Sequence, residues 1–443
     1  MFSPIIIRNA FIVDAISNYN GCTADVFLEN GKIRRIGIID NPPENAEIID
    51  ADECFLIPGF VQAHIHLCQT LFRGLAEDLP LLDWLKDKIW RLEAAHDEET
   101  LFHSATLGLA EMIKSGVTSC LSMETLHLTD SVFEAAEASG LRCFIGNALM
   151  DQGNDIPPKM LLSTEKSLQE CQRLIEKYHG REGGRIAYAF APRFILSSSL
   201  DLLQEIDTLA KKHNLLVHTH AAENRDETSA AADLYHCGAI QLFADLGLAA
   251  PNLCLAHCIW LNDDEYHLLQ KFGLKVLHCP GSNLKLGSGL ADITKMRNMN
   301  ITVGLASDGA ACNNTLDPFL EMRLAAYLQN ILHHPGALSA KEIFRMMTFG
   351  GAQCLSVENI TGSIAEGKAA DLVLLDRNSL HTSPHYDSDP FTEIVYSMRP
   401  ENVKMTIAGG KILYRKEAYF LWDEAEIMRN GEIARRKLLS KME

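Results

Sequence analysis

The sequence predicts an α/β protein: a (β/α)8 TIM barrel with a small β-sandwich domain built from both ends of the chain. Strand and helix patterns alternate between residues 58 and 360, as in folds made of repeated β-α units. The two flanking segments instead contain short β-branched runs separated by turn signals. Polar residues also follow several of the central strands, at the end where barrels of this class carry their active sites.

The composition fits a globular protein and excludes some partners. The chain has 443 residues, 47% hydrophobic and 22% charged, enough for a large core and a second domain. Its formal net charge of −18 argues against nucleic acid or an anionic membrane, because both need a basic face. The absence of 18 uninterrupted apolar residues predicts no membrane span.

The cysteines and the N-terminal run predict a cytoplasmic protein. The 12 cysteines are scattered and form no CxxC pair, which is typical of reduced, buried thiols. The run MFSPIIIRNAFIVDA has an apolar stretch too short and too soon broken for a signal peptide.

Both ends of the chain predict β structure. In segment 1–57, apolar runs flank Asn30-Gly31, which is a strong hairpin signal. In segment 361–422, residues 371–376 form a strand, and Gly409-Gly410 separates two short runs of a second hairpin. Because domain termini usually lie close together, we expect 1–57 and 361–422 to form one composite β-sandwich domain. Residues 423–443 are charge-mixed and predict a surface helix.

The central segment, 58–360, predicts the barrel. Its short Val/Ile/Leu/Ala/Cys-rich runs suit parallel strands buried on both faces. The eight expected strands are 60–66, 117–123, 142–149, 186–191, 215–220, 252–258, 274–278 and 302–307. Helical patterns lie between them, for example 98–114, 131–139, 200–213 and 318–329. A doubly wound open sheet is the alternative, but no GxGxxG follows the first strand.

Histidines and acids follow four of these strands. His64 and His66 share one face of the first strand, since residues i and i+2 point the same way. The fifth strand ends in His218 and His220 with Glu223 three residues on, the sixth in His257 and the eighth in Asp308. A bonded core histidine or a helix-capping Asp explains any one of them, but not four at the predicted site.

Three imidazoles and one carboxylate with an open position describe a catalytic metal site. Zinc suits this ligand set best, and Fe(II) is the alternative. The fourth strand ends in Ala191-Pro192-Arg193, which offers no bridging Lys or Glu for a second ion. We therefore expect one divalent metal per chain.

The HxH, HxxE, AHC and SDGAACNN segments stand in an order that resembles the amidohydrolase superfamily, in its mononuclear deaminase branch. The resemblance covers essentially the whole chain. It implies four metal ligands, namely His64, His66, His220 and Asp308. It leaves His218 behind the ligands, because Glu223 follows His220 at the family spacing.

The resemblance also implies catalytic roles for Glu223, His257 and Asp308. The metal would lower the pKa of its water, and Glu223 would carry the water proton to a ring nitrogen of the substrate. His257 would stabilise the developing charge, and Asp308 would pass a proton to the leaving ammonia. The presence of Glu223 favours deamination over dechlorination.

Two subfamilies compete for the substrate. Segments 66–93, 283–287 and 309–323 resemble S-adenosylhomocysteine, methylthioadenosine and 5'-deoxyadenosine deaminases, and proteins named N-ethylammeline chlorohydrolase. The resemblance places Trp84 and Glu93 at the site, with Glu93 on ribose hydroxyls. Segments 79–85, 192–194 and 223–227 resemble guanine deaminase, in which residues at the positions of Gln69 and Arg193 bind the base.

The favoured substrates are accordingly 5'-modified adenosines, with Glu223 and His257 also contacting the heteroaromatic ring. The alternatives are a guanine, oxopurine or pterin deaminase, an s-triazine (chloro)hydrolase, and a non-catalytic binding homologue. The branch commonly forms homo-oligomers, and we expect the same here. Arg73 and Glu124 are expected in an ion pair beside the site, and His278 in loop shaping.

Overall fold

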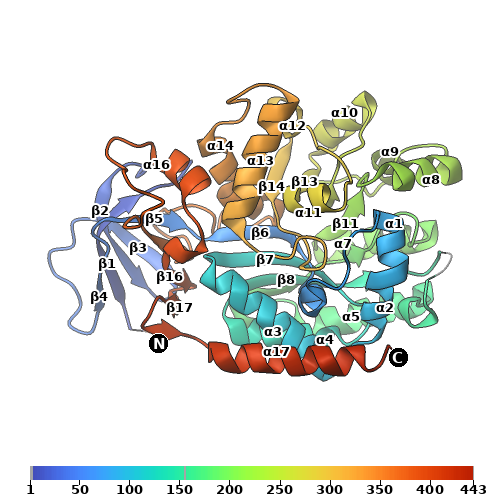
Figure 1. Cartoon of the computed structure of the whole chain (residues 1–443), viewed down its shortest axis with the longest axis horizontal. Coiled ribbons are helices and arrows are strands. Elements are labelled where there is room, and N and C mark those ends of the chain that lie inside the picture. Colours follow the sequence, from blue (N-terminus) through green and yellow to red (C-terminus); the bar gives the residue numbers. More distant parts are fainter. Residues whose placement is uncertain (1–2, 154–155, 443) are drawn as a thin grey trace.

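The computed structural model describes residues 3–153 and 156–442 and contains three sheets, with most of the helices gathered around the strands β6 to β14 (Figure 1). Two sheets are parallel, and the third is a mixed sheet at one end of the molecule. The chain is therefore a mixed α/β protein, as predicted. The outermost residues of the predicted terminal segments, 1–2 and 443, lie outside the described residues.

The first parallel sheet has five strands in the order β10-β8-β7-β6, with β9 also beside β8. They are β6 (Phe60–Ile65), β7 (Val117–Glu124), β8 (Arg142–Leu149), β9 (Ile186–Tyr188) and β10 (Ala191–Pro192). Nearly every residue of these strands is buried, as expected where helices cover one face and packed side chains the other.

The second parallel sheet has four strands in sequence order. They are β11 (Val217–Ala221), β12 (Leu253–His257), β13 (Lys275–His278) and β14 (Thr302–Leu305). A parallel bridge between Phe190 and Val217 joins it to the first sheet. On the other side, Asp308 N, just after β14, donates at 3.1 Å to the carbonyl of His64, which lies in β6.

The predicted strand 186–191 forms two short elements, β9 and β10, which pair with β8 in one unbroken register, since Tyr188 lies opposite Ile145 and Ala191 opposite Ala148. Phe190 lies between them and bonds to β11 on the other side. Its N–H donates to Leu216 O at 2.9 Å, and its carbonyl accepts from His218 N at 2.8 Å. This stretch therefore pairs with β8 on one side and with β11 on the other.

Helices connect the parallel strands. α3 (Glu98–Lys114) begins and ends as predicted because Asp97 and Thr100 form a capping box. α7 (Leu200–His213) also has its predicted bounds, since the Ser199 hydroxyl accepts from Leu202 N at 3.1 Å. The others are α1 (Leu81–Trp84), α2 (Trp90–Ala94), α4 (Thr129–Ser139), α5 (Thr164–Tyr178), α6 (Arg181–Gly184), α8 (Arg225–Tyr235), α9 (Ala239–Asp245), α10 (Asp263–Phe272), α11 (Pro280–Lys285), α12 (Ile293–Asn298), α13 (Pro318–Leu332), α14 (Ala340–Arg345), α15 (Gly351–Cys354), α16 (Pro390–Thr392) and α17 (Glu424–Leu439).

Short 3-10 and π-helical turns also lie between the strands of the parallel sheets and of the mixed sheet. The 3-10 turns are η1 (Leu67–Phe72), η3 (Pro158–Met160) and η6 (Pro400–Asn402), and the π-helical turns are η2 (Leu85–Ile89), η4 (Met346–Gly350) and η5 (Glu393–Ser397).

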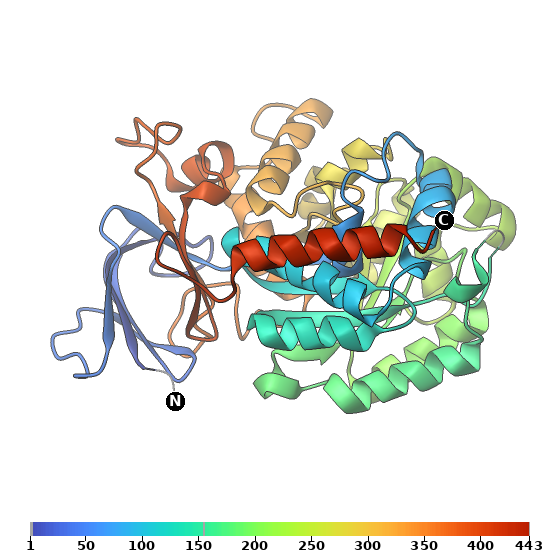
Figure 2. The same cartoon turned by 60° about the horizontal axis from the view of Figure 1, so that its bottom comes forward.

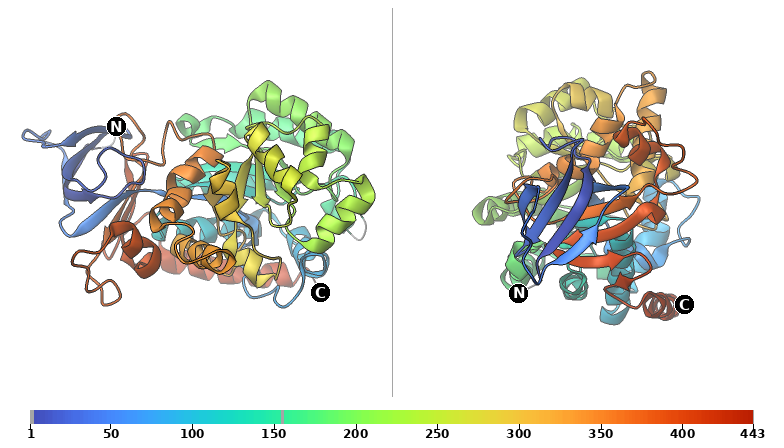
Figure 3. Two further views of the ribbon diagram at one scale, coloured as in Figure 1. Left: turned by 90° about the horizontal axis from the view of Figure 1, so that it is seen from above. Right: turned by 90° about the vertical axis from the view of Figure 1, so that its left-hand side faces the viewer.

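The mixed sheet draws its nine strands from an N-terminal and a C-terminal part of the chain, and the strands of the two parts lie side by side in Figure 3. The N-terminal part contributes β1 (Ile5–Ile12), β2 (Thr23–Glu29), β3 (Lys32–Gly37), β4 (Glu47–Asp50) and β5 (Cys54–Pro58). The C-terminal part contributes β15 (Leu372–Asp376), β16 (Val403–Ala408), β17 (Lys411–Arg415) and β18 (Tyr419–Phe420). β5 pairs antiparallel with β15 and joins the two parts.

Both predicted hairpins are confirmed. Asn30 and Gly31 have φ of 52° and 76° between β2 and β3, the left-handed geometry that a tight turn between twisted strands requires. Gly409 and Gly410 do the same between β16 and β17, with φ of 54° and 75°.

The predicted C-terminal helix is α17, which lies along α3 (Figure 2). Lys114 Nζ donates to both carboxylate oxygens of Glu424 at 2.6 and 2.7 Å across this contact. Within residues 3–153 and 156–442, no helix has the length and apolar character needed to cross a membrane.

Candidate active site

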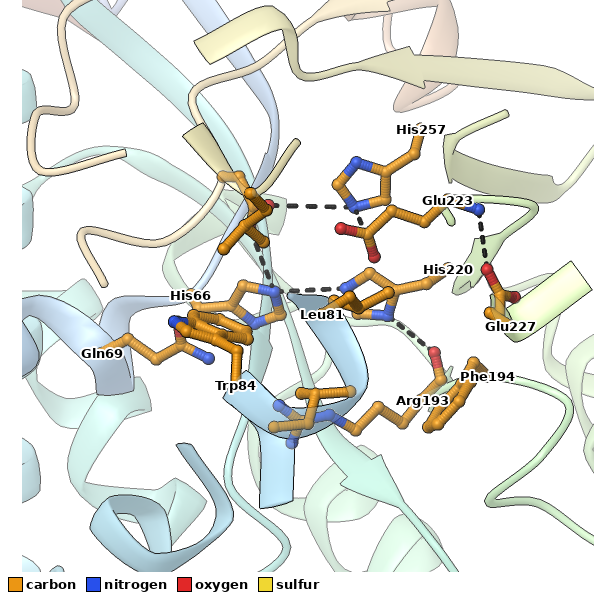
Figure 4. Close-up of a pocket in the computed structure, with 13 residues that line it drawn as sticks. His66, Gln69, Leu81, Trp84, Arg193, Phe194, His220, Glu223, Glu227 and His257 are labelled. Atoms are coloured by element: carbon orange, nitrogen blue, oxygen red, sulfur yellow. Dashed lines mark hydrogen bonds and ion pairs between the residues drawn. The ribbon is translucent and has the colours of Figure 1, made fainter. Parts of the chain in front are cut away.

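Most of the predicted site residues meet at the carboxyl ends of the parallel strands and line one pocket (Figure 4). The predicted residues that line it are His66, Gln69, Trp84, Arg193, His220, Glu223, His257 and Asp308. His64 lies fully buried beside them, and Glu93 is buried next to Gln69 and Arg193.

Three imidazoles are fixed through their Nδ1 atoms. His66 Nδ1 donates to Met123 O, and His220 Nδ1 to Arg193 O, both at 2.7 Å. His64 Nδ1 lies 2.6 Å from Nε2 of His218, so His218 stands behind His64. Partners of this kind set the ring orientation and leave Nε2 free to bind a metal.

The free Nε2 atoms converge with the Asp308 carboxylate. Asp308 Oδ1 lies 3.2 Å from His64 Nε2 and 3.3 Å from His66 Nε2, and the Nε2 atoms of His66 and His220 are 3.3 Å apart. A tetrahedral zinc site with bonds of about 2.0–2.1 Å separates neighbouring ligand atoms by about 3.3–3.4 Å. The observed distances fit this geometry.

Electrostatics favour the same arrangement. Burial lowers the pKa of His64 to about 4 and lowers the pKa of His220 as well, which keeps both imidazoles in the neutral form that binds metals. Burial would lower the pKa of His66 too, but the adjacent Asp308 carboxylate outweighs it and the net shift is upward. Burial raises the pKa of Asp308, yet His64 and His66 hold it well below its usual range.

Glu223 and His257 stand beside this cluster. Glu223 Oε2 lies 3.5 Å from His257 Nε2, which is 3.8 Å from Asp308 Oδ2. Burial raises the pKa of Glu223 to about 7, a value suited to proton transfer near neutrality. His257 Nδ1 faces Asn283 Oδ1 at 2.8 Å, and its Nε2 has no hydrogen-bond partner among the described residues.

The predicted recognition residues form one buried network. Arg193 donates to Glu93 through two nitrogens, at 2.7 and 3.1 Å, and Gln69 Nε2 donates to Glu93 at 3.0 Å. Gln69 Oε1 is buried without a hydrogen-bond partner within the described part of the chain. The Glu93 carboxylate therefore accepts hydrogen bonds from three protein N–H groups, whereas Gln69 Oε1 remains an unused acceptor.

Apolar side chains cover the cluster. Trp84 is anchored by a hydrogen bond from its Nε1 to Ala76 O at 3.0 Å, and Leu81, Leu85, Phe194 and Leu286 complete the apolar lining. The space that remains is about 30 Å³. The pocket is therefore narrow in this structure.

Sequence reasoning missed several residues that shape the site. Glu227 Oε2 accepts from Glu223 N at 2.7 Å, and Asn283 contacts His257. Both lie inside segments that carry the family resemblance, 223–227 and 283–287, which was the available signal. Cys279 Sγ lies within 4.8 Å of the candidate ligand atoms of His64, His257 and Asp308, but burial raises the pKa of its thiol well above the usual value.

Three other residues named from the sequence lie outside the pocket lining. Arg73 pairs with Glu111, and Glu124 accepts from Cys68 N at 2.8 Å at the start of η1. His278 is buried, and burial lowers its pKa to about 3.

Comparison with known proteins identifies this architecture. A protein-family model with the description "Amidohydrolase family" matches residues 55–413, which is most of the chain. The chain belongs to the amidohydrolase family. The strand-end cluster therefore occupies the matched region, with every candidate ligand between residues 64 and 308.

Two relatives and one solved structure show what the chain is similar to. It is 36% identical to a 5'-deoxyadenosine deaminase of Methanothermobacter thermautotrophicus, with 98% of each chain covered. It is also 36% identical to a 5-methylthioadenosine/S-adenosylhomocysteine deaminase of Thermococcus onnurineus, over 92% of this chain and 93% of that one. The crystal structure of an adenosine deaminase from Xanthomonas campestris with bound zinc matches with a TM-score of 0.90 at 28% identity, covering 98% of each chain.

Proposed function

We propose that the protein is a metal-dependent hydrolytic deaminase that replaces the exocyclic amine of a purine-like heteroaromatic by oxygen and releases ammonia. One observation carries this proposal: three Nε2 atoms and the Asp308 carboxylate converge beside the buried carboxyl of Glu223. Relatives named as deaminases, similar over nearly the whole chain, support it.

We infer that one divalent ion, with zinc favoured over Fe(II), binds at this cluster. The proposed ligands are His64, His66, His220 and Asp308. Their donor set and spacing suit a tetrahedral ion with an open position, and the buried His64 Nε2 has no hydrogen-bond partner in the described ranges. Cys279 is a poor ligand here, because metals bind the thiolate and this thiol stays protonated.

The side chains then have distinct tasks. His64, His66, His220 and Asp308 would hold an ion that would make water nucleophilic near neutral pH. Glu223, whose pKa is about 7, takes the water proton and delivers it to a ring nitrogen, which activates the adjacent carbon. His257 presents Nε2 toward Glu223 and Asp308, where it orients the water and stabilises negative charge on the new oxygen. Asp308 would take the second proton of that water once its oxygen has bonded to the carbon, and pass it to the amine, which leaves as ammonia.

The relatives and the pocket favour different substrate classes. Full-length similarity favours 5'-modified adenosines, such as 5'-deoxyadenosine, methylthioadenosine or S-adenosylhomocysteine. The Gln69–Glu93–Arg193 network favours the alternative, a free oxopurine such as guanine or a pterin. A ribose diol would find most Glu93 lone pairs already occupied, whereas the free Gln69 Oε1 suits a ring N–H donor.

We also propose that the parallel sheets are halves of one closed (β/α)8 TIM barrel spanning 58–360. The Phe190–Val217 bridge on one side and the Asp308–His64 backbone bond on the other support closure. Segments 1–57 and 361–422 are proposed to fold as a β sandwich, with 423–443 as a C-terminal helix. The bridge between Lys32 and Ala369 supports the sandwich, because it brings β3 back to the segment before β15. Cytoplasmic location and homo-oligomer formation stay predictions.

The test is ammonia release from 5'-deoxyadenosine, methylthioadenosine, S-adenosylhomocysteine, adenosine, guanine, pterins and aminotriazines. Wild-type protein is expected to deaminate a purine-like substrate. Glu223→Gln is expected to lose at least about 10²-fold in kcat while keeping close to one metal ion per chain.

A matched control is Glu227→Gln, which changes a neighbouring buried carboxyl that binds the Glu223 backbone N–H. It is expected to retain more activity than Glu223→Gln. Chloride release from chlorotriazines without ammonia release would assign a dechlorinase instead. Metal-free protein that binds these compounds without turnover would assign a non-catalytic homologue.

A further inference from the structure

One buried carboxylate lies behind the site and contacts two of its supporting loops. Glu321 on α13 is fully buried. Its Oε2 accepts from Gly281 N at 2.9 Å, and its Oε1 accepts from Asn313 Nδ2 at 2.7 Å. Its two partners therefore come from two different strand-end segments, one after β13 and one after β14.

The first branch leads to His257. Gly281 is in the first turn of α11, and two residues on, Asn283 lies 2.8 Å from His257 Nδ1. A Cβ on Gly281 would lie 2.5 Å from Glu321 Oε1, so only glycine allows this close approach. The Glu321–Gly281 bond therefore fixes the helix that orients His257.

The second branch leads to Asp308. Asn313 Nδ2 also donates to Ser307 O at 2.6 Å, the carbonyl directly before Asp308. Asp308 has a φ of 62°, in the left-handed region that residues with a Cβ adopt uncommonly. The Glu321–Asn313 bond thus holds the turn that presents the proposed metal ligand.

Burial raises the pKa of Glu321 to about 8, since its partners are uncharged amides that offset only part of the desolvation cost. Burying this carboxyl removes it from water, which opposes folding unless hydrogen bonds compensate. Its two bonds are the gain that the structure offers against that cost.

We propose that Glu321 is a positioning residue that fixes the positions of the Asp308 and His257 side chains relative to each other in the active site. This inference rests on the proposed function, because it assigns Asp308 and His257 their tasks there. Glu321 acts through Asn313 and Gly281 and touches neither residue itself.

The experiment compares Glu321→Gln with a matched control, Glu265→Gln. Glu265 is likewise buried, accepts backbone N–H bonds from Ile240 and Asn262 at 3.2 Å, and is approached closely by a glycine, Gly238. It lies on α10, outside the pocket lining. Both variants lose a buried carboxylate that accepts from the backbone, so their difference isolates the position of Glu321.

Two readouts are measured: the dissociation constant for Zn2+ by chelator competition, and kcat and KM for ammonia release at saturating Zn2+. In Glu321→Gln the new NH2 group faces one of the two donors that now bind Glu321, Gly281 N–H or Asn313 Nδ2–H, and that hydrogen bond is lost. Because the Asp308 turn is then less well held, we expect Zn2+ affinity to fall about 10–100-fold. At saturating Zn2+ we expect kcat to fall at least about tenfold with KM nearly constant, because His257 remains misplaced. Glu265→Gln is expected to change neither value more than about twofold.

Asn313→Ala is the second variant, should Glu321→Gln fold poorly. It cuts only the branch toward Asp308, so Zn2+ binding is expected to weaken about tenfold while kcat at saturating Zn2+ falls less than in Glu321→Gln. Equal behaviour of Glu321→Gln and Glu265→Gln, or wild-type Zn2+ affinity in Asn313→Ala, would overturn the proposal. The Zn2+ readout is independent of substrate, so failure of the proposed function would show separately as a wild-type protein without deaminase activity.

Discussion

Substitutions in the ion pair between Arg193 and Glu93 can distinguish its contribution to folding stability from its contribution to substrate recognition. Both side chains are almost fully buried, with exposed fractions of 4% and 1%, and they share two hydrogen bonds at 2.7 and 3.1 Å. The perturbation is a double-mutant cycle of Arg193→Met, Glu93→Gln and the two together. Glu93→Gln keeps an oxygen that can accept from Gln69, so that contact is preserved.

The magnitude follows from burial. Removing one partner leaves the other charge unpaired in a desolvated site, which costs about 3–5 kcal/mol. A chain of 443 residues unfolds with an entropy of about 0.9 kcal/mol/K, at about 2.1 cal/mol/K per residue. Each single variant should therefore lower Tm by about 3–5 °C for cooperative unfolding. The double variant removes both charges and should recover most of that loss.

The assay is thermal unfolding of metal-loaded protein in parallel with ammonia release. We expect the double variant to regain Tm but not kcat/KM, because the donors and acceptors at the pocket wall are gone. Lys211→Met is the control, since Lys211 and Asp207 form an exposed ion pair worth less than about 1 kcal/mol.

Two results would refute this reasoning. Single variants with Tm within about 1 °C of wild type would mean that removing one partner does not leave the other as an unpaired buried charge. A double variant with wild-type kcat/KM would mean that the pair is structural and reads no part of the substrate.

Two further predictions concern metal and pH. Dialysis against a chelator should abolish ammonia release and lower Tm, and Zn2+ at about 100 times its dissociation constant should restore about 2.7 kcal/mol of stability, hence about 3 °C; full activity of metal-free protein would contradict the ligand assignment. Burial lowers the pKa of His96 to about 4, so the unfolded chain binds a proton there that the folded chain refuses as pH falls below 6.5. Stability should therefore decline from pH 6.5 toward 4 in wild type and decline less steeply in His96→Gln, as measured by Tm across that range; identical slopes would show that His96 does not titrate this way.

The strands and several helix ends were predictable because their signals are local. Asp97 and Ser199 stand where a capping side chain is needed, and the helices begin directly after them. The histidines and acids at the strand ends were also readable, because parallel strands bring their carboxyl ends to one edge. The single strand 186–191 is divided into β9 and β10, and the bonds of Phe190 to β11 depend on where that distant strand lies.

Side-chain partnerships could not be predicted, because they depend on the approach of elements far apart in sequence. His218 and His220 share a face of β11, and sequence spacing alone does not show that His218 stands behind His64. Glu93 and Arg193 were assigned separate recognition tasks, yet they bind each other between α2 and β10. Glu321 has ordinary helical spacing, so nothing in its local pattern distinguishes it from a solvated glutamate.

The composite mixed sheet has a consequence for how the chain is synthesised. β5 leaves the ribosome early, but its antiparallel partner β15 is translated only after the whole central segment. Until then β5 presents an unpaired edge beside β1, and such edges favour contact with other chains. Pairing β5 with β15 also closes a loop of the whole central segment, and the entropy lost on closing so long a loop slows this step of folding. Folding of the mixed sheet should thus complete only after translation, and a nascent chain released before β15 should be the species most prone to aggregation.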